Sequence, residues 1–566
     1  MRYFHLNTCL LKRFLLFFLL LISISSMSAQ TFRLKIIGSS DAESKVIDSI
    51  GYSQIIPNAK AASEEATILS GKLQKIGYLS NQVTESTKPS DSLFHHKLSL
   101  GKKINLTHIY IGKDSALKTL QITQQKSDTL TMPFAETEIF LNRMLNSLES
   151  KGYSLARLKL INLNIVGSNM YADLNLDLGV KRQLNEIVIS GYDKFPKGHK
   201  RNIERMYRNK TFNQENLKKI HDDFQKFRFV GQTKYPEILF SKDTTKVYVY
   251  LEKAKPNRFD GFIGFSNDAD ENNLTFQGYL DLMLVNIMNS GEQFTLYWKS
   301  DGKEQKTFNA GIELPYIFKS PIGLKASLNI FKQDSTFQNT RSSLDLGYFF
   351  NYNTRLYVGY QSTESSDIQN QNNFSISDFN NTFITSNFEY VNYRADDFLF
   401  PEQTRASIRL GVGSRESNQS KNDQIFSELH LSHNVYLNQK NIFNIKSQNY
   451  YLNSGQYILN ELYRFGGINS IRGFNENSLQ ANFFSSVLTE YRYVVAPNIY
   501  VHSIIDYGYY RDDTTDNGGG LLGLGFGFGL LTKNGLLNLV YANGSTDEQS
   551  IKLSNSIVHI SFRATF

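Results

Sequence analysis

Cysteine is almost absent from this sequence. The chain has 566 residues and one cysteine, Cys9, which precedes an apolar run from Phe14 to Ile24. A lone cysteine excludes an internal disulfide, and its position ahead of the apolar run does not fit the acylated cysteine of a lipoprotein. We therefore expect neither disulfides nor thiol chemistry to contribute to the function.

Long hydrophobic runs are also scarce. Beyond the N-terminus no stretch supplies the ~18 uninterrupted apolar residues that a membrane-spanning helix needs, and the mean hydropathy is −0.35. These two facts exclude a polytopic helical membrane protein. They do not exclude a transmembrane β-barrel, in which only alternate residues face lipid and the average hydropathy stays low.

Charge of one sign does not dominate the sequence. The 61 basic residues are dispersed and accompanied by 53 acidic ones, which leaves a net charge of +8. An excess of this kind indicates a solvated surface rather than a nucleic-acid interface. Aromatic residues are plentiful, with 41 Phe and 32 Tyr, and membrane barrels use such residues in their interfacial girdles.

The N-terminus has the layout of a secretory signal. Arg2, Lys12 and Arg13 lie before the apolar run, and small residues follow it up to Ala29. This order of a basic, an apolar and a small-residue segment predicts a signal peptide over residues 1–29. We therefore expect the chain to be exported.

A unit of about 75 residues recurs in the first half of the chain. The hexapeptide LQKIGY at Leu73–Tyr78 returns as LESKGY at Leu148–Tyr153. Each copy closes a helical pattern, so that Gly77 and Gly152 stand where a left-handed helix cap is needed. This spacing predicts small repeated domains.

Two strand-like stretches follow in each copy, and the second ends at Gly101 or Gly179. A third, more divergent copy follows. We predict three βααββ domains, over residues 30–105, 106–182 and 183–256. Their order of elements resembles the POTRA domain, and the resemblance implies periplasmic units whose exposed sheet edges bind extended clients. The alternative is three spacer domains without a binding role.

The second half, residues 257–566, changes to short alternating segments separated by turns rich in Asn, Asp, Ser and Gly. Leu522–Leu530 alternates apolar residues with glycine, which is the period of a β-strand. An open sheet edge in lipid would leave backbone groups unpaired, so a membrane sheet has to close. At about 19 residues per strand and loop, the segment predicts a transmembrane antiparallel β-barrel of about sixteen strands. The last strand resembles the C-terminal recognition signal of outer-membrane barrels, carried by Val558, Ile560, Phe562 and Phe566.

The most specific motif is RFGGINSIRGF at Arg464–Phe474. It resembles the GG…(V/I)RG(F/Y) signature of the superfamily of BamA, TamA and the two-partner-secretion transporters, and three repeats make the chain more like the short TamA type. The resemblance implies a long extracellular loop that folds back into the barrel lumen. The motif residues in this sequence are Gly466, Gly467, Arg472, Gly473 and Phe474.

The guanidinium of Arg472 needs carboxylate partners if it is partly desolvated inside a narrow lumen. Alternation along the next two strands points Glu490 and Asp506 inward, and their positions match the family's acidic residues. We therefore predict that they bind Arg472; the alternative is that they are ordinary polar residues of the lumen. Asp396–Pro401 resembles the family's D…P…G turn, with Thr404 where glycine is usual.

Enzyme signatures are missing. No G-x-S-x-G or H-E-x-x-H occurs, and His430 and His433 fall on opposite faces of a predicted strand, which is wrong for a shared metal. The alternating glycines near Gly525 are not followed by a helical pattern, so they do not form a dinucleotide-binding loop. We predict a protein without catalytic activity, cofactor or metal.

Together these features predict an outer-membrane assembly factor with its N-terminal domains in the periplasm. The expected partners are unfolded outer-membrane or secreted proteins, the lipid bilayer, and accessory periplasmic or lipoprotein subunits, but not nucleic acid. Insertion would use a weakened seam between the first and last barrel strands. The rival hypotheses are a two-partner-type secretion pore for one exoprotein, and a receptor or passive channel whose repeats only scaffold a partner.

Overall fold

The computed structural model describes residues 31–112, 117, 127–267, 274–301, 305–369, 376–394, 397, 399–418, 420–533, 535–552 and 556–565. The predicted signal peptide lies outside these residues. The chain divides into two compact units, Met1–Arg182 and Gln183–Phe566. Among the described residues, no helix combines the length and apolarity that crossing a membrane requires.

The first unit begins with a sheet covered by two helices. Its elements are β1 (Phe32–Gly38), α2 (Asp41–Ile50), β2 (Ile55–Ile56), α3 (Ala59–Lys75), β3 (Gln82–Ser90) and β4 (Leu93–Ser99). The sheet order is β2-β1-β4-β3, with β1 parallel to β4. Helix α3 buries Leu69 and Leu73 against Leu98 of β4. Asn58 caps its N-terminus with a side-chain oxygen.

The second domain of this unit contains β5 (Leu106–Tyr110), β6 (Thr129–Pro133), α5 (Phe134–Ser150), β7 (Arg157–Val166) and β8 (Asn169–Asp177). Its sheet order is β6-β5-β8-β7. Strand β6 directly precedes α5 and pairs antiparallel with β5, just as β2 precedes α3 and pairs antiparallel with β1 in the first domain. Both domains thus add one strand to the predicted βααββ order. The threonine-rich sequence of β6 favours this edge strand.

The predicted cap and strand-end glycines have positive φ. Gly77 (φ 111°) and Gly152 (φ 99°) follow helices α3 and α5, while Gly101 (φ 68°) and Gly179 (φ 61°) follow β4 and β8. Gly77 also lies so close to the backbone of Ile104 that a Cβ would collide with it. Glycine is therefore required at this position for both conformation and space.

The second unit opens with a third α/β domain. It contains β9 (Glu186–Ser190), α6 (Lys197–Tyr207), α7 (Gln214–Gln225), β10 (Val230–Phe240) and β11 (Thr245–Lys253), with sheet order β10-β11-β9. Leu217, Ile220 and Phe224 recur at helical spacing on α7, and all three are buried. These residues belong to an apolar core that continues into the barrel, where it includes Met283 and Phe349.

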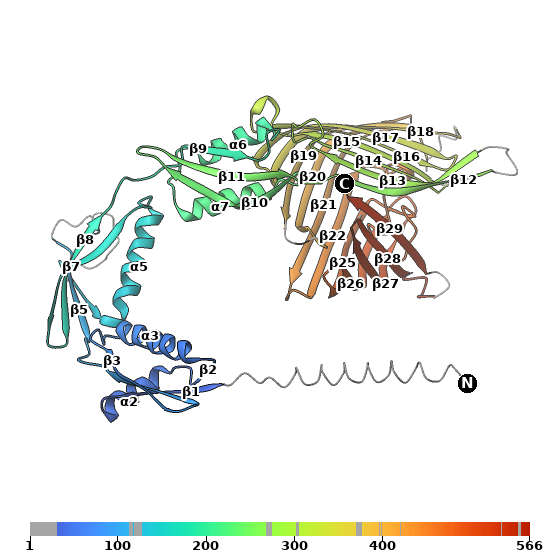
Figure 1. The fold of residues 1–566 in the computed structure, drawn as a ribbon. Coiled ribbons are helices and arrows are strands. Elements are labelled where there is room, and N and C mark those ends of the chain that lie inside the picture. The colour runs from blue at the N-terminus through green and yellow to red at the C-terminus, as the bar shows by residue number, and fades with distance from the viewer. Residues whose placement is uncertain are drawn as a thin grey trace, which may run out of the picture. The chain divides into compact units, whose positions relative to one another are not determined.

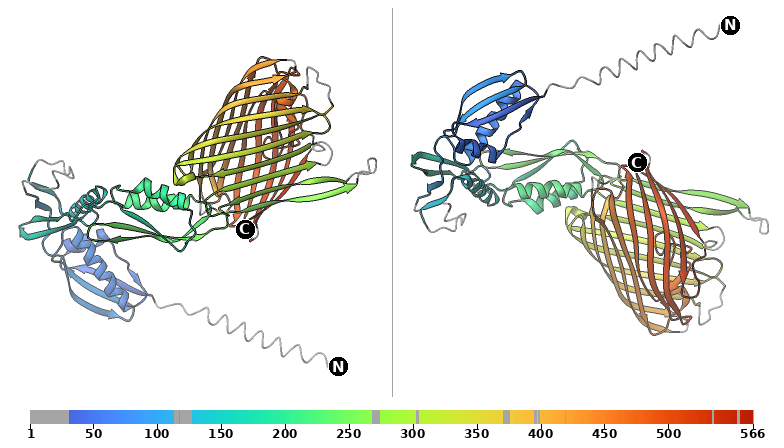
Figure 2. Two further views of the ribbon diagram at one scale, coloured as in Figure 1. Left: turned by 90° about the horizontal axis from the view of Figure 1, so that it is seen from above. Right: turned by 90° about the horizontal axis from the view of Figure 1, so that it is seen from below.

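Sixteen of the strands that follow in the described residues form a closed barrel (Figure 1). Figure 2 shows the strands running obliquely around the cylinder. The prediction of α/β repeats followed by an antiparallel barrel of about sixteen strands is confirmed. The strands are β12 (Arg258–Asn267), β13 (Leu274–Val285), β14 (Gln293–Asp301), β15 (Gln305–Leu314), β16 (Ile322–Gln333), β17 (Phe337–Asn351), β18 (Thr354–Asp367), β19 (Phe379–Tyr393), β20 (Glu402–Ser417), β21 (Lys421–Tyr436), β22 (Asn441–Ser454), β25 (Phe483–Ala496), β26 (Ile499–Asp512), β27 (Asn517–Thr532), β28 (Gly535–Thr546) and β29 (Ile557–Thr565).

The barrel wall is apolar outside and polar inside. On β26, Ile505 and Tyr507 are 54% and 60% exposed on the outer face, whereas His502 and Asp506 are buried in the lumen. A water-soluble sandwich would place its apolar residues the other way round. The exterior is therefore suited to hydrocarbon.

The third α/β domain is attached to the barrel through His199 of α6. This side chain is fully buried, and its ring lies 4.7 Å from that of Tyr316 and 5.3 Å from that of Phe229, centroid to centroid. A Cβ at Gly291 would overlap the imidazole. Burial, assisted by the charge of Arg355, lowers the pKa of His199 to about 3.

This attachment is expected to weaken in acid. His199 is neutral in the folded protein, and its pKa is about 6.5 when its surroundings open. The stability that its burial contributes to the attachment is therefore complete above pH 6.5 and decreases as the pH falls toward 3. The free energy of local opening of α6 should fall by about 1.4 kcal/mol per pH unit below 6.5. Hydrogen exchange of α6 amides at pH 7 and pH 5 measures it. His199→Leu, the control, should lose this pH dependence; an equal dependence in both proteins would contradict the assignment.

Candidate functional site

The candidate site is the loop between β22 and β25, which enters the barrel lumen. Its two arms, β23 (Tyr463–Phe465) and β24 (Leu479–Ala481), pair as a hairpin. The ring of Phe465 stacks on Phe484 of the barrel wall with 4.0 Å between centroids. We call residues 455–482 the plug loop.

The tip of the plug loop carries Arg472, which is 3% exposed. Its Nε donates to Oδ2 of Asp506 at 2.7 Å and its Nη2 donates to Oδ1 at 2.5 Å, so the two groups form a bidentate pair. The backbone N–H of Arg472 donates to the same carboxylate at 3.0 Å. Asp506 therefore fixes both the side chain and the main chain of the tip.

Glu490 is the second carboxylate at this position. It accepts a hydrogen bond from Nη1 of Arg472 and another, at 2.7 Å, from Nε of Arg492. The structure thus brings the three predicted residues together, and it adds Arg492 as a second cation. Two arginines thus face two carboxylates, and this pairing lowers the cost of burying all four charges.

The motif glycines allow the tip to approach the wall. Gly473 has φ 90°, and a Cβ there would collide with the backbone of Asn543 on β28. On β27, a Cβ at Gly523 would collide with the carbonyl oxygen of Arg472. Gly466 (φ 104°) and Gly467 (φ 98°) begin the turn. Glycine is therefore needed on both sides of this contact.

Phe474 completes the motif by packing within the apolar cluster of the plug loop. A Cβ at Gly544 of β28 would lie 2.8 Å from its ring, so this wall position is also free of a side chain for a steric reason. The tip thus combines one ionic and one apolar contact.

A second ionic contact holds the base of the plug loop. Glu461 accepts hydrogen bonds from Arg415 at 2.5 Å and from Gln424 at 2.8 Å, and the side chains of Arg415 and Glu461 are both almost fully buried. Sequence reasoning did not find this pair. Alternation along β20 would have pointed Arg415 inward, but nothing in the sequence links it to a residue 46 positions later.

The turn between β19 and β20 is the segment that resembles the family's D…P…G turn. It is only partly described, since Asp396 and Phe398 lie outside the described residues. Asp397 accepts from the backbone N–H of Phe400 at 2.8 Å and from the hydroxyl of Tyr436 at 2.7 Å. Phe400 in turn lies 4.5 Å from the guanidinium of Arg492. The turn therefore supports the cluster around Arg472. Thr404 lies within β20.

The predicted C-terminal signal lies on β29. Val558, Ile560 and Phe562 are all exposed on the outer face of the barrel. Phe566 lies outside the described residues. Among the described residues, no group of three or more His, Cys, Asp and Glu side chains is placed to hold a metal ion.

The N-terminal sheets present free edges. Strand β7 is an outer strand of its sheet, and Leu163, Ile165 and Val166 are more than half exposed on it. An edge strand with exposed apolar residues can bind an extended segment through main-chain hydrogen bonds and apolar contacts.

Comparisons with solved structures identify the fold. The chain is similar to CdiB from Acinetobacter baumannii, with a TM-score of 0.51, 15% identity, and coverage of 82% of this chain and 90% of that one. For CdiB from Escherichia coli the TM-score is 0.50, with 13% identity and coverage of 88% and 96%. The fold is that of CdiB.

The structure of BamA from Haemophilus ducreyi lacking POTRA domains 1-3 also matches, with a TM-score of 0.48, 15% identity, and coverage of 82% and 100%. No protein-family model matches the sequence, and no curated protein gives a significant match. The similarity to CdiB confirms the predicted fold, while nearness to TamA stays a prediction.

The ionic cluster gives a direct test of the plug loop. Arg472→Leu should destabilise the barrel by about 3–5 kcal/mol, because Asp506 then stays buried without its cation. Arg472→Leu combined with Asp506→Asn should recover part of this loss. The temperature at which the heat-resistant band is lost in detergent electrophoresis measures the stability of both variants.

The matched control is Arg511→Leu on β26, the strand that carries Asp506, since the side chains of Arg511 and Asp513 are 52% and 35% exposed. It should cost no more than about 1 kcal/mol. If Arg472→Leu behaved like this control, the plug loop would not be held by its arginine.

Proposed function

We propose that this chain is an outer-membrane transporter of the BamA and two-partner-secretion superfamily that acts in membrane-protein assembly. Its N-terminal domains lie in the periplasm and receive unfolded polypeptides, and its barrel helps them insert into the outer membrane. The signal-like N-terminus, the apolar exterior of the barrel and the fold of CdiB support the location. The observation that carries the assembly role is the seam of the barrel.

The seam joins β12 to β29 through three residue pairs among the described residues, from Arg258 opposite Thr565 to Asp260 opposite Arg563. By contrast, β28 and β29 pair at eight positions and β12 and β13 at ten. Opening the barrel here breaks fewer backbone hydrogen bonds than opening it between either of these neighbouring strands. Each freed edge can then accept a strand from a client.

The exposed edge of β7 supports a role in receiving clients. Main-chain pairing gives affinity for extended segments of many sequences. A chain captured in this way is already extended, which is the conformation that pairing at the seam requires. The proposed function involves no catalysis and no cofactor.

Secretion of one dedicated exoprotein is the second candidate. It is favoured by the similarity to CdiB and by a cavity of about 860 Å³ that borders the plug loop at Arg472 and Glu476. This function would require the plug loop to leave the lumen, whereas assembly through the seam does not.

Depletion of the protein separates these functions. We expect many outer-membrane barrels to decrease together when the outer-membrane proteome is quantified, because one assembly factor serves many clients. Loss of a single surface protein would instead identify a secretion pore, and an unchanged proteome would identify a receptor or passive channel.

A cross-link across the seam tests the route. The predicted mature chain has no cysteine of its own, so Phe259→Cys combined with Ala564→Cys, which are directly opposite each other, introduces one disulfide. Insertion of client barrels into the outer membrane should stop under oxidising conditions and resume after reduction.

The control pair is Phe528→Cys with Leu539→Cys, which joins two strands that already pair along most of their length. It should leave assembly unchanged. Normal assembly with a closed, oxidised seam would contradict the proposed route.

A further inference from the structure

One face of helix α6 is strongly basic. Lys197, Arg201 and Arg205 recur at helical spacing and are exposed, and Arg208, the residue that follows the helix, is exposed as well. The opposite face buries His199 and neighbouring residues against the barrel and the domain core. A solvated helix surface usually mixes both signs of charge. Here Glu204 is the one acidic residue of the helix.

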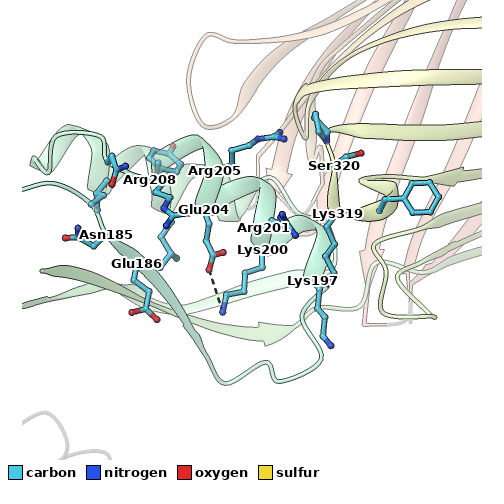
Figure 3. Close-up of a pocket in the computed structure, with 16 residues that line it drawn as sticks. Asn185, Glu186, Lys197, Lys200, Arg201, Glu204, Arg205, Arg208, Lys319 and Ser320 are labelled. Carbon is cyan, nitrogen blue, oxygen red and sulfur yellow. Dashed lines mark ion pairs between the residues drawn. The ribbon is translucent and has the colours of Figure 1, made fainter.

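This basic face borders a cavity of about 1020 Å³ that also touches β9 and the β15–β16 turn. Its lining carries six cationic side chains and two carboxylates, as Figure 3 shows. The carboxylates already have partners: Glu204 pairs with Lys200 at 3.7 Å and Glu186 with Lys246 at 2.7 Å. The cavity therefore has a large excess of positive charge. Its cationic residues are Lys197, Lys200, Arg201, Arg205, Arg208 and Lys319.

The basic face is fixed in relation to the barrel. Besides the buried His199, the side-chain amide of Asn202 donates to the backbone carbonyl of Ser320 at 3.1 Å. A Cβ at Gly198 would lie 3.0 Å from Tyr316, so the helix lies directly against the turn. The cationic groups are thus held in a fixed position relative to the barrel wall.

The turn that completes the cavity exposes an aromatic side chain. Phe318 is 95% exposed, and it lies between Tyr316 and Lys319 in a turn where all three residues have positive φ. Such backbone strain costs about 1–2 kcal/mol per residue and persists where the position has a role.

Beyond this turn the apolar exterior of the barrel begins. Ile322 of β16 and its partner Tyr348 of β17 are both exposed on the outer face. Phe318 and the mouth of the cavity therefore lie where the membrane-facing surface ends and the α/β domain starts.

We propose that this cavity binds the phosphate headgroup of an anionic phospholipid in the leaflet next to the third α/β domain, with Phe318 inserted among the acyl chains. The proposal rests on the membrane placement given under the proposed function. Clustered Lys and Arg at a membrane surface attract anionic headgroups, and an exposed aromatic residue at the same level enters the interface. A soluble anion would make no use of the exposed ring or of the adjoining apolar wall.

The test uses the full-length protein in detergent with a mixture of phosphatidylglycerol and phosphatidylcholine, and native mass spectrometry to measure retained lipid. The wild type should retain phosphatidylglycerol preferentially. The variant Lys197→Gln/Arg201→Gln/Arg208→Gln should reduce this preference by roughly tenfold or more, because each basic residue near the surface contributes to attraction of anionic lipid. These three side chains have no carboxylate partner within the described part of the chain.

The matched control is Lys218→Gln/Lys219→Gln/Lys253→Gln, which removes the same charge from exposed positions of the same domain outside the cavity. It should keep the wild-type preference. A heat-resistant barrel in each variant shows that it is folded. Equal retention of both lipids by the wild type, or an equal loss in the control, would overturn the proposal.

Two further measurements test whether the molecule bound in the cavity is a lipid. Phe318→Ser should lower the retention of both lipids alike and leave their ratio unchanged; full retention of both would contradict insertion of the ring. Inorganic phosphate at millimolar concentration should not displace the lipid, and displacement would show a site for a soluble anion instead.

The lipid measurement involves no client. Absence of lipid preference would therefore reject this site without rejecting the assembly role. An unchanged proteome after depletion would reject the assembly role without rejecting this site.

Discussion

A guanidinium buried in the lumen has to be neutralised where it lies, and this requirement determines how the plug loop folds. Removing Arg472 from water is expensive, and only carboxylates with good geometry compensate for it. Asp506 and Glu490 provide them from two adjacent strands, and Arg492 adds a second cation beside Glu490. Because the partners belong to the wall, the tip can take only one position, and the glycines on both sides follow from that position. The pair of Arg415 with Glu461 applies the same constraint at the base of the loop.

The barrel is subject to a second constraint, which is the pairing of backbone groups in a medium without water. The need for backbone pairing explains why the sheet is closed, and the absence of water explains why its outer residues are apolar. The strength of pairing is nevertheless uneven around the wall. The long central strands pair along most of their length, whereas the first and last strands meet over three residue pairs in the part of the chain that the structure describes. The wall is thus stable as a whole and locally weak at one join.

Much of this architecture follows from the sequence because it depends on local periodicity. Alternation along β25 and β26 fixed the inward direction of Glu490 and Asp506, and the charge of Arg472 required partners of their kind. The repeat of LQKIGY as LESKGY located the helix ends at Gly77 and Gly152. Other features depend on contacts between distant segments. The partner of Arg415, the strand β6 ahead of α5, the number of pairs at the seam and the cavity beside α6 all required the folded chain, since no periodic pattern encodes them.

The seam differs from every other join in the wall in a topological way. Neighbouring barrel strands elsewhere are successive in the chain, and a turn or loop ties each such pair together at one end. Strands β12 and β29 are the first and last of the barrel, and no connection bridges them directly. If these two strands separated, no connecting loop would close the opening at either end. A folded hairpin could then enter the opening from the side, and neither end of its chain would have to pass through first.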